Sequence, residues 1–289
     1  MQVEELHNVV VIGAGLMGAG IAEVFARSGY EVNLVDVEQR FIDKGMEAIH
    51  NSLSKAVQRG KATQNDADNA TKRIHPMLSL KSAAKDIQFA VEAVIENPSV
   101  KKQVFKELDE NAPKGAIFAS NTSSISITEV ASATKRPDCV IGMHFFNPPP
   151  VMKLIEIIRG AATSEETFKL TEALSQKLGK TTVDVQEAPG FVVNRVLVPF
   201  LNEAVCLVHE GVSSPKDIDT AIKLGLNHPM GPLELLDFVG LDTTLYILDY
   251  MFDETKDPKF RACPLLRKMV RAGYWGRKTG KGFYEYPAK

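Results

Sequence analysis

Cysteine is scarce in this sequence, and the few cysteines form no pattern. Cys139, Cys206 and Cys263 lie far apart and include no CxxC pair. Such spacing argues against a disulfide framework and against a zinc site built on paired cysteines. We therefore expect a reducing, cytoplasmic setting and no bound metal.

The sequence also lacks a surplus of either charge. Its 289 residues include 34 Lys and Arg against 36 Asp and Glu, which leaves a formal net charge of −2. A protein that wraps nucleic acid neutralises many phosphates and needs a clear excess of positive charge. The balance therefore argues against nucleic acid as a partner, and any basic site must be local.

No apolar run is long enough to span a membrane. The longest apolar stretch, residues 191–208, is interrupted by Asn194, Arg195 and Glu203 among others, whereas a spanning helix needs about 20 predominantly apolar residues. The polar, acidic residues 1–7 resemble neither a signal peptide nor a transit peptide. We expect no association with a membrane.

The sequence does contain a regular alternation of short apolar runs and amphipathic stretches over its first two thirds. This pattern is typical of a doubly wound, mostly parallel α/β sheet covered by helices on both faces. Strands are predicted at residues 8–12, 31–35, 89–95, 116–119, 140–145, 154–158 and 182–185, and helices at 17–28, 40–59, 100–111, 127–133 and 165–178.

After residue 187 the pattern changes to helix upon helix, with breaks at Pro189, Gly211, residues 229–232 and Gly240. The sequence thus predicts two domains, each large enough to bury its own core. The first, residues 1–187, is a Rossmann-type α/β domain, as its glycine-rich turn indicates. The second, residues 188–289, is all-helical.

That glycine-rich turn follows the first predicted strand directly, where residues 13–18 have the sequence GAGLMG and open a helix. Gly13 would make the tight turn, Gly15 would let a pyrophosphate approach the backbone, and Gly18 would let the helix pack closely on the strand. The first-turn amides and the helix dipole would hold the anion. By itself the motif is weak evidence, and FAD or a turn that binds nothing are alternatives.

An acidic residue at the end of the second predicted strand strengthens the nucleotide interpretation. Asp36 lies 18 residues after Gly18. A carboxylate at this position accepts hydrogen bonds from a ribose 2′-hydroxyl and repels a 2′-phosphate. The sequence therefore favours NAD over NADP.

Two later strands deliver polar residues to the same edge of the sheet. The strand at 116–119 leads into the polar residues 121–124, and the strand at 140–145 carries His144 near its end, before prolines that exclude a helix. Open α/β sheets bind ligands outside the carboxyl ends of their strands. His144 is therefore a candidate general base. An ordinary hydrogen-bonded or solvated histidine is the alternative.

A lone carboxylate, Glu156, interrupts the next apolar strand. A buried carboxylate needs a partner, and His144 is the economical candidate. Asn194 likewise stands at the head of an apolar helical stripe, with Val198, Leu201 and Val205 on the same face. A hydrogen bond at the helix terminus is the alternative use of Asn194.

Taken together, these segments resemble the 3-hydroxyacyl-CoA dehydrogenases, and among them the short, stand-alone bacterial 3-hydroxybutyryl-CoA dehydrogenases. The resemblance is carried by the glycine turn with Asp36, residues 120–124 (SNTSS), residues 144–148 (HFFNP) and residues 189–195 (PGFVVNR). It extends over nearly the whole chain, including residues 228–232 (HPMGP) and 278–284 (KTGKGFY).

This resemblance implies an NAD-dependent oxidoreductase that interconverts (S)-3-hydroxyacyl-CoA and 3-oxoacyl-CoA, with short acyl chains favoured. It implies that His144 is the general base paired with Glu156, and that Ser123 and Asn194 hydrogen-bond the reacting oxygen or thioester. The residues implied for the NAD site are Gly13, Gly15, Leu16, Met17, Gly18, Asp36, Glu96, Lys101, Asn121 and Lys278.

The resemblance also implies a CoA site on the helix after the second strand. Ser52 matches the family's CoA-contacting serine, and Arg59 stands where relatives often carry a lysine. Lys55 fits an anionic ligand, although a solvated helix face is an equally good account of it. Pro149, where relatives commonly have alanine, departs from the pattern, with little expected consequence.

Two other functions stay open. A related NAD-dependent dehydrogenase of β-hydroxyacids would share the glycine turn, but such relatives typically use a lysine base on a helix. A non-catalytic protein, similar to the lens crystallins that resemble this family, would not need a buried acid and base.

The apolar helices of the second domain would cover the substrate cleft and form a homodimer interface, as the resemblance implies.

Overall fold

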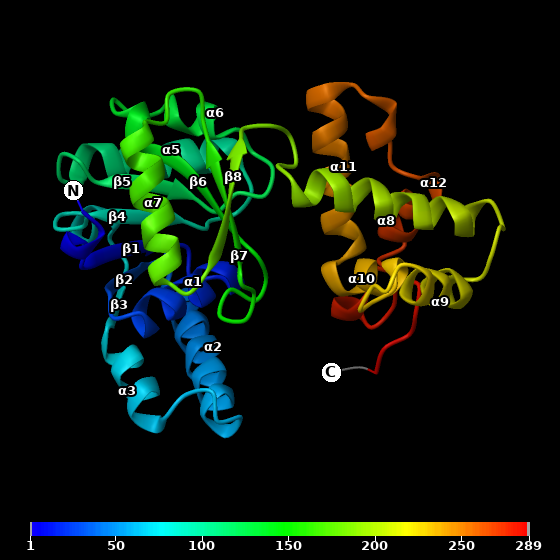
Figure 1. Cartoon of the computed structure of the whole chain (residues 1–289), viewed down its shortest axis with the longest axis horizontal. Helices are drawn as coiled ribbons and strands as arrows, with labels where there is room; N and C mark the ends of the chain where they lie inside the picture. The colour runs from blue at the N-terminus through cyan, green and yellow to red at the C-terminus, as the bar shows by residue number, and fades with distance from the viewer. Residues whose placement is uncertain (1, 288–289) are drawn as a thin grey trace. The chain divides into compact units, whose positions relative to one another are not determined.

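The computed structural model describes residues 2–287, and these form two compact units (Figure 1). The first unit ends at Ala188, and the second begins at Pro189. This division lies one residue beyond the point at which the sequence pattern changes. Each unit has its own buried apolar core.

The described part of the first unit is built around one sheet of eight strands, in the order β3-β2-β1-β4-β5-β6-β7-β8. Neighbouring strands from β3 to β6 are parallel, β7 is antiparallel to β6, and β8 is parallel to β7. The strands are β1 (Asn8–Ile12), β2 (Glu31–Val35), β3 (Ile74–Met77), β4 (Phe89–Glu92), β5 (Ile117–Ser120), β6 (Val140–Phe145), β7 (Leu154–Arg159) and β8 (Thr181–Gln186). The predicted fold class is confirmed.

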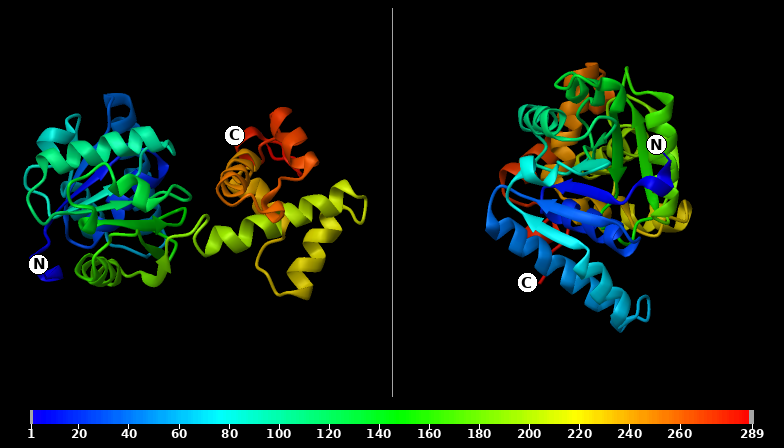
Figure 2. Two further views of the ribbon diagram at one scale, coloured as in Figure 1. Left: turned by 90° about the horizontal axis from the view of Figure 1, so that it is seen from above. Right: turned by 90° about the vertical axis from the view of Figure 1, so that its left-hand side faces the viewer.

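Helices cover both faces of this sheet (Figure 2). They are α1 (Leu16–Arg27), α2 (Gln39–Gln58), α3 (Gln64–Lys72), α4 (Leu80–Ala83), α5 (Pro98–Asn111), α6 (Ile127–Ala131) and α7 (Glu165–Lys177). Short 3₁₀ helices lie at Val3–Glu5 and Pro137–Cys139. Helix α1 packs on strands β1, β2 and β3, and α7 packs on β6, β7 and β8.

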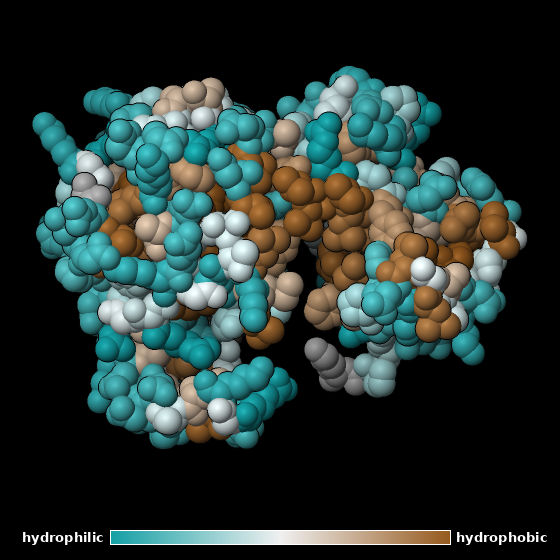
Figure 3. All heavy atoms as spheres, in the orientation of Figure 1, coloured by the Kyte–Doolittle hydropathy of each residue, from teal (hydrophilic) through white to brown (hydrophobic). Residues whose placement is uncertain are grey.

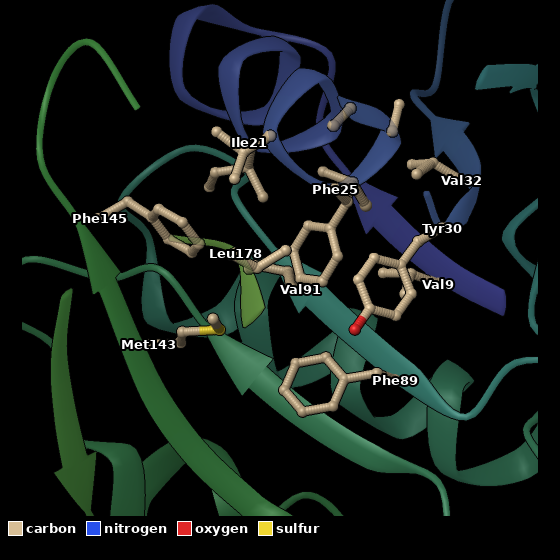
Figure 4. Close-up of a cluster of buried hydrophobic side chains, with 14 of the residues drawn as sticks. Val9, Ile21, Phe25, Tyr30, Val32, Phe89, Val91, Met143, Phe145 and Leu178 are labelled. Carbon is tan, nitrogen blue, oxygen red and sulfur yellow. The ribbon is translucent and has the colours of Figure 1, made fainter. Parts of the chain in front are cut away.

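The centre of the sheet is apolar on both faces. Val10 of β1 is fully buried, as are its neighbours in the strand, which is expected for a parallel strand covered on two sides. Phe25 of α1 meets Tyr30 edge to face, with 5.7 Å between ring centroids, and lies 6.5 Å from the ring of Phe89 in β4 (Figure 4). Large buried rings contribute strongly to core stability, so this packing holds α1, and with it the turn between β1 and α1, firmly against the sheet.

Helix α5 begins close to the end of β4, and its first turn is fixed by local sequence. The Asn97 side chain accepts hydrogen bonds from the N–H groups of Ser99 (3.0 Å) and Val100 (3.2 Å). Pro98 occupies the first helical position, where no N–H donor is needed. This start places Lys101 in the first turns of the helix, where its side chain is buried.

The sequence pattern did not predict α3, β3 or α4. Helix α3 buries only two alanines, so it has no apolar stripe to detect. Strand β3 is a short edge strand that contains Pro76, and proline weakens a strand signal. Strand β4 ends at Glu92 rather than at residue 95. Glu92 pairs with Ile12, the last residue of β1, and the next residue of the chain, Ala93, lies against Gly13.

The second unit is helical. It contains α8 (Val193–His209), α9 (Pro215–Gly225), α10 (Pro232–Val239), α11 (Leu241–Thr255) and α12 (Pro264–Arg271), with 3₁₀ helices at Pro258–Phe260 and Arg277–Thr279. Buried side chains from α8, α10, α11 and α12, such as Leu201, Leu236, Leu248 and Leu266, form its core. Within residues 2–287, no helix combines the length and apolar character that crossing a membrane would require.

Asp237 of α10 holds the last described residues of this unit through hydrogen bonds. Its buried carboxylate accepts hydrogen bonds from the N–H groups of Phe283 and Tyr284 (both 2.9 Å) and from the Tyr286 hydroxyl (3.0 Å). Gly282 is required here, since a Cβ atom on it would lie 2.0 Å from a carboxylate oxygen. Burial raises the pKa of Asp237, and the two backbone donors act against this rise.

Candidate active site

The glycine turn between β1 and α1 leaves no room for side chains at two of its positions. Gly13 has a φ of +99°, and a Cβ atom on it would lie 2.5 Å from the Ala93 carbonyl oxygen. A Cβ atom on Gly18 would lie 1.7 Å from the carbonyl oxygen of Gly13. Helix α1 can therefore start directly against the end of β1 only because both residues are glycine.

Gly15 is different, because a Cβ atom there would meet no protein atom within 4 Å. It lies exposed at the N-cap of α1, with Leu16 exposed and Met17 half-buried in the first turn. The space left open lies where the helix N–H groups and the positive end of the helix dipole face outward. The turn therefore fits the pyrophosphate of a dinucleotide.

Asp36 is tied to this turn. One carboxylate oxygen accepts a hydrogen bond from the N–H of Ala14 (2.7 Å), and the other accepts from the N–H of Val37 (2.7 Å). A carboxylate has about four acceptor positions, so capacity remains for the two ribose hydroxyls. The geometry fits the cofactor role expected of Asp36.

The loop after β5 is organised by Glu96. One oxygen of Glu96 accepts hydrogen bonds from the Thr122 hydroxyl, the Ser123 N–H (3.0 Å) and the Ser124 hydroxyl (3.1 Å). Burial would raise the pKa of Glu96, but the Lys101 charge and the hydrogen bonds outweigh it, so that the pKa lies below its ordinary value of 4.5. Glu96 thus holds Ser123, the residue expected to contact the substrate, through the main chain.

A second carboxylate, Glu92, belongs to the same group and was not predicted. The Lys101 ammonium lies 2.7 Å from Oε1 of Glu92 and 3.1 Å from Oε2 of Glu96. The Ser120 hydroxyl donates to Oε2 of Glu92 at 2.6 Å. In the sequence Glu92 interrupts the apolar run of residues 89–95. A carboxylate inside an apolar run is the signal that identified Glu156, and it would also have identified Glu92.

Asn121 connects this loop to the strand that carries His144. Its buried side-chain oxygen accepts a hydrogen bond from the N–H of Phe145 at 2.9 Å. Strand β5 ends at Ser120, so the Asn121 side chain supplies an acceptor that the main chain of β5 no longer provides. The residue expected in the cofactor site therefore also supports the end of β6.

His144 of β6 and Glu156 of β7 are buried side by side in the sheet. Nδ1 of His144 is 2.7 Å from Oε2 of Glu156, and the two residues are 5% and 0% exposed. A carboxylate can only accept, so Nδ1 carries the hydrogen and Nε2 is the basic nitrogen. The Phe146 ring lies against the imidazole, with 4.6 Å between centroids.

The loop between β6 and β7 is held from two sides. The Lys180 ammonium donates to the carbonyl oxygens of Pro149 (2.6 Å) and Met152 (2.8 Å). Pro149 is buried against α1, where a Cβ atom on Gly20 would lie 2.8 Å from the proline ring. Pro149, the departure from the family pattern, thus fills a contact with α1. The Asn147–Pro148 peptide bond is cis.

The residues expected to contact CoA lie along α2 and at its end. Lys55 and Arg59 are exposed, whereas Ser52 is half-buried. Ser52 faces the buried Glu23 of α1; burial raises the pKa of Glu23, and a hydrogen bond from Ser52 opposes this rise. At the other end of the helix, a Cβ atom on Gly45 would lie 2.6 Å from the Ala14 carbonyl oxygen, so α2 packs directly on the glycine turn.

Two of the expected site residues belong to the second unit. Asn194 is half-buried in the first turn of α8, ahead of the buried Val198 and Leu201. The Lys278 ammonium donates to Asp242 at 2.6 Å. Across the described residues, His, Cys, Asp and Glu side chains form no group of three or more that could hold a metal ion.

Comparison with known proteins agrees with this geometry. Residues 8–188 match the model of the 3-hydroxyacyl-CoA dehydrogenase NAD binding domain, and residues 190–286 match that of the C-terminal domain of the same family. The two matches together cover almost the whole chain.

Individual relatives are similar to this chain along nearly their full length. The chain is 48% identical to a probable 3-hydroxybutyryl-CoA dehydrogenase of Bacillus subtilis, over 99% of each chain. It is 49% identical to the 3-hydroxybutyryl-CoA dehydrogenase of Clostridioides difficile, over 96% of this chain and 99% of the relative. The crystal structure of (S)-3-hydroxybutyryl-CoA dehydrogenase from Ralstonia eutropha superposes with a TM-score of 0.94 at 46% identity, covering 98% of this chain and 100% of that one. The chain therefore belongs to the 3-hydroxyacyl-CoA dehydrogenase family.

Proposed function

We propose that this protein is an NAD-dependent dehydrogenase that interconverts (S)-3-hydroxyacyl-CoA and 3-oxoacyl-CoA, with 3-hydroxybutyryl-CoA and acetoacetyl-CoA as its main pair. The observation that carries the proposal is the buried His144–Glu156 pair, 2.7 Å apart, at the sheet edge that also holds the glycine turn. The full-length relatives from Clostridioides difficile and Ralstonia eutropha are 3-hydroxybutyryl-CoA dehydrogenases, which supports the same substrate pair.

Bound NAD supplies the hydride acceptor for oxidation of the alcohol. Gly13, Gly15 and Gly18 would hold the cofactor's pyrophosphate through the main chain, and Asp36 would bind its adenosine ribose. Leu16 and Met17 of the first helical turn, together with Glu96, Asn121 and Lys278, are also proposed to contribute to the cofactor site. Lys101 is buried, so it would act on this site through Glu96 and not by direct contact.

His144 has the chemistry of the general base. Its Nε2 takes the proton of the 3-hydroxyl group, and the resulting imidazolium is stabilised by the carboxylate of Glu156. In the reverse direction the same imidazolium returns the proton to the ketone oxygen. Such proton transfer contributes roughly 10²- to 10⁴-fold to the rate.

Ser123 and Asn194 are proposed to hydrogen-bond the reacting oxygen or the thioester. Ser52 and Arg59, with Lys55 nearby, are proposed to contact CoA; the two exposed cations suit its phosphates. Holding the alcohol beside the cofactor could supply about 7 to 11 kcal/mol of the barrier.

The direct test is the decay of NADH absorbance at 340 nm when the protein is mixed with acetoacetyl-CoA. We expect turnover by the wild-type protein, and a loss of roughly 10²- to 10⁴-fold in kcat for His144→Gln. The variant should still bind NADH, because His144 lies outside the glycine turn. No decay with folded wild-type protein would refute the proposed activity, and a folded His144→Gln protein that no longer binds NADH would reassign the histidine.

We also propose that the protein is a homodimer associated through its second unit. Large apolar side chains are exposed on this unit, among them Val196 (71%) and Leu224 (81%), and Figure 3 shows hydrophobic patches over it. Exposed apolar clusters of this kind commonly mark subunit interfaces. Light scattering should give the mass of a dimer, and a monodisperse monomer at micromolar concentration would refute the proposal.

The cytoplasmic location stays a prediction from the cysteine spacing.

A further inference from the structure

We infer that the buried cluster of Glu92, Lys101 and Glu96 determines how the protein divides its affinity between the oxidised and the reduced dinucleotide. The inference rests on the NAD site proposed above and goes beyond it. Glu92 accepts hydrogen bonds from Val94, Lys101 and Ser120, and its side chain is completely buried.

The cluster is costly to bury. Glu92 and Lys101 are 0% and 1% exposed, and taking an ion out of water costs several kcal/mol unless partners compensate. Apolar side chains of similar volume are often as stable as, or more stable than, such buried ion pairs. Fold stability is therefore a weak explanation for the charges of Glu92 and Lys101, which points to a use in function.

The hydrogen-bond partners of Glu92 indicate that its side chain is ionised. Its Oε1 accepts from the Val94 N–H (2.7 Å) and from Lys101, and its Oε2 accepts from the Ser120 hydroxyl. The Ser120 oxygen itself accepts from the Thr122 N–H at 3.2 Å, so the hydroxyl proton points to Glu92. Each of these partners is a donor, so Glu92 is a carboxylate.

Glu96 is ionised for the same reason, since it accepts from two hydroxyls, one backbone N–H and the Lys101 ammonium. Two carboxylates and one ammonium leave the cluster with a formal charge of −1. The charge is fixed in place, because Ser120 at the end of β5 holds Glu92 and the loop after β5 holds Glu96. Lys101 lies near the start of α5 and is buried.

Strand pairing places this charge beside the glycine turn. Glu92 is the last residue of β4 and pairs with Ile12, the residue before Gly13, on one side and with Ser120 of β5 on the other. Asp36 follows β2, on the opposite side of β1. A dinucleotide with its adenosine ribose at Asp36 and its pyrophosphate at the turn must extend its nicotinamide half over the ends of β4 and β5.

The nicotinamide ring is cationic in NAD⁺ and neutral in NADH, whereas the rest of the cofactor is the same. A fixed negative charge near the ring therefore stabilises the oxidised form alone, and interactions with the pyrophosphate cancel from the comparison. For two unit charges in a medium of effective dielectric constant near 20, a separation of about 8 to 10 Å with partial screening corresponds to roughly a threefold to thirtyfold change in affinity.

The test measures the dissociation constants of NAD⁺ and NADH by isothermal titration for the wild type and for Glu92→Gln, which keeps the shape and removes the charge. We expect the ratio of the NAD⁺ constant to the NADH constant to rise by roughly threefold to thirtyfold in the variant. A tenfold rise corresponds to about 30 mV in the potential of the bound two-electron couple. An unchanged ratio in a folded variant would overturn the inference.

Two controls separate charge from structure. Ser120→Ala deletes a hydrogen bond to the same carboxylate without changing the formal charge, and it should leave the ratio at the wild-type value. Glu110→Gln removes an exposed charge at the far end of α5 and should also leave it there. A shift with Ser120→Ala as large as that with Glu92→Gln would refute the electrostatic explanation.

Two further variants keep the test decisive if Glu92→Gln does not fold. Glu96→Gln removes one charge from the same cluster at a side chain that is 28% exposed, and its ratio should move in the same direction. The double variant Glu92→Gln/Lys101→Gln restores the formal charge of −1 and should restore the ratio. Wild-type protein that binds neither cofactor would instead refute the NAD site, whereas binding of both with unchanged ratios in the charge variants would refute this inference alone.

Discussion

Glu156 lies directly opposite His144 across the antiparallel strands β6 and β7, with 2.7 Å between Oε2 and Nδ1. Residues that pair directly place their side chains on the same face of a sheet. A shift of the pairing by one residue would move one of the two side chains to the opposite face. The sheet register itself therefore assembles the pair, and both strands must be well anchored.

Removing the charge of Glu156 should impair the chemical step. We expect Glu156→Gln to lower kcat roughly 10- to 150-fold, because a hydrogen bond to a charged group contributes about 1.5 to 3 kcal/mol. The KM for acetoacetyl-CoA should change much less. Steady-state kinetics across pH would check this, and a normal kcat at every pH would remove Glu156 from the mechanism.

Asn121 should matter for stability as well as for ligands. Asn121→Ala deletes the acceptor for the buried N–H of Phe145, and an unsatisfied buried donor costs about 1 to 3 kcal/mol of unfolding free energy. We also expect a lower kcat, since the end of the strand that carries His144 is loosened. Urea unfolding provides the measurement, with the exposed Asn51→Ala as the control. Equal stability of Asn121→Ala and the wild type would contradict the structural role.

The lowered pKa of Glu96 predicts part of the acid sensitivity of the first unit. Because its pKa in the folded protein lies below 4.5, this carboxylate stabilises the fold fully above about pH 4.5 and loses that contribution as the pH falls through the lowered pKa. Glu96→Gln should therefore show a flatter decline of unfolding free energy below about pH 4.5 than the wild type. Parallel curves for the two proteins would show that Glu96 makes no such contribution.

Asp237 should stabilise the last described segment of the second unit. Asp237→Ala leaves the N–H groups of Phe283 and Tyr284 and the Tyr286 hydroxyl without their acceptor, and we expect a loss of about 3 kcal/mol or more. Thermal unfolding and proteolysis of residues 276–287 would measure it. The control is Asp253→Ala at an exposed position of α11, which should behave like the wild type.

Much of this architecture could be predicted from sequence because its signals are local. The glycine turn, Asp36 and the position of His144 at a strand end each depend on a few consecutive residues and on the apolar run before them. Glu156 was found because a carboxylate inside an apolar strand needs a partner, and the nearest suitable strand end supplied one.

The remaining features depend on which strands are neighbours, and no local pattern contains that information. Glu92, Ser120 and Lys101 meet because β4 lies beside β5 and α5 starts next to them. Lys101 was expected at a ligand surface, and its burial between two carboxylates became visible only in three dimensions. Asn121 likewise has its partner 24 residues away.

Helix α2 extends from the glycine turn to the distal residues that are proposed to contact CoA. It is anchored at Gly45, where no side chain fits against Ala14, and at 1.5 Å per residue Arg59 lies about 20 Å further along the axis. Under the CoA contacts proposed for Lys55 and Arg59, mutations near the distal end would change the binding of the acyl carrier and leave the glycine turn intact. Substrate range and coenzyme choice would then be separable traits of this protein.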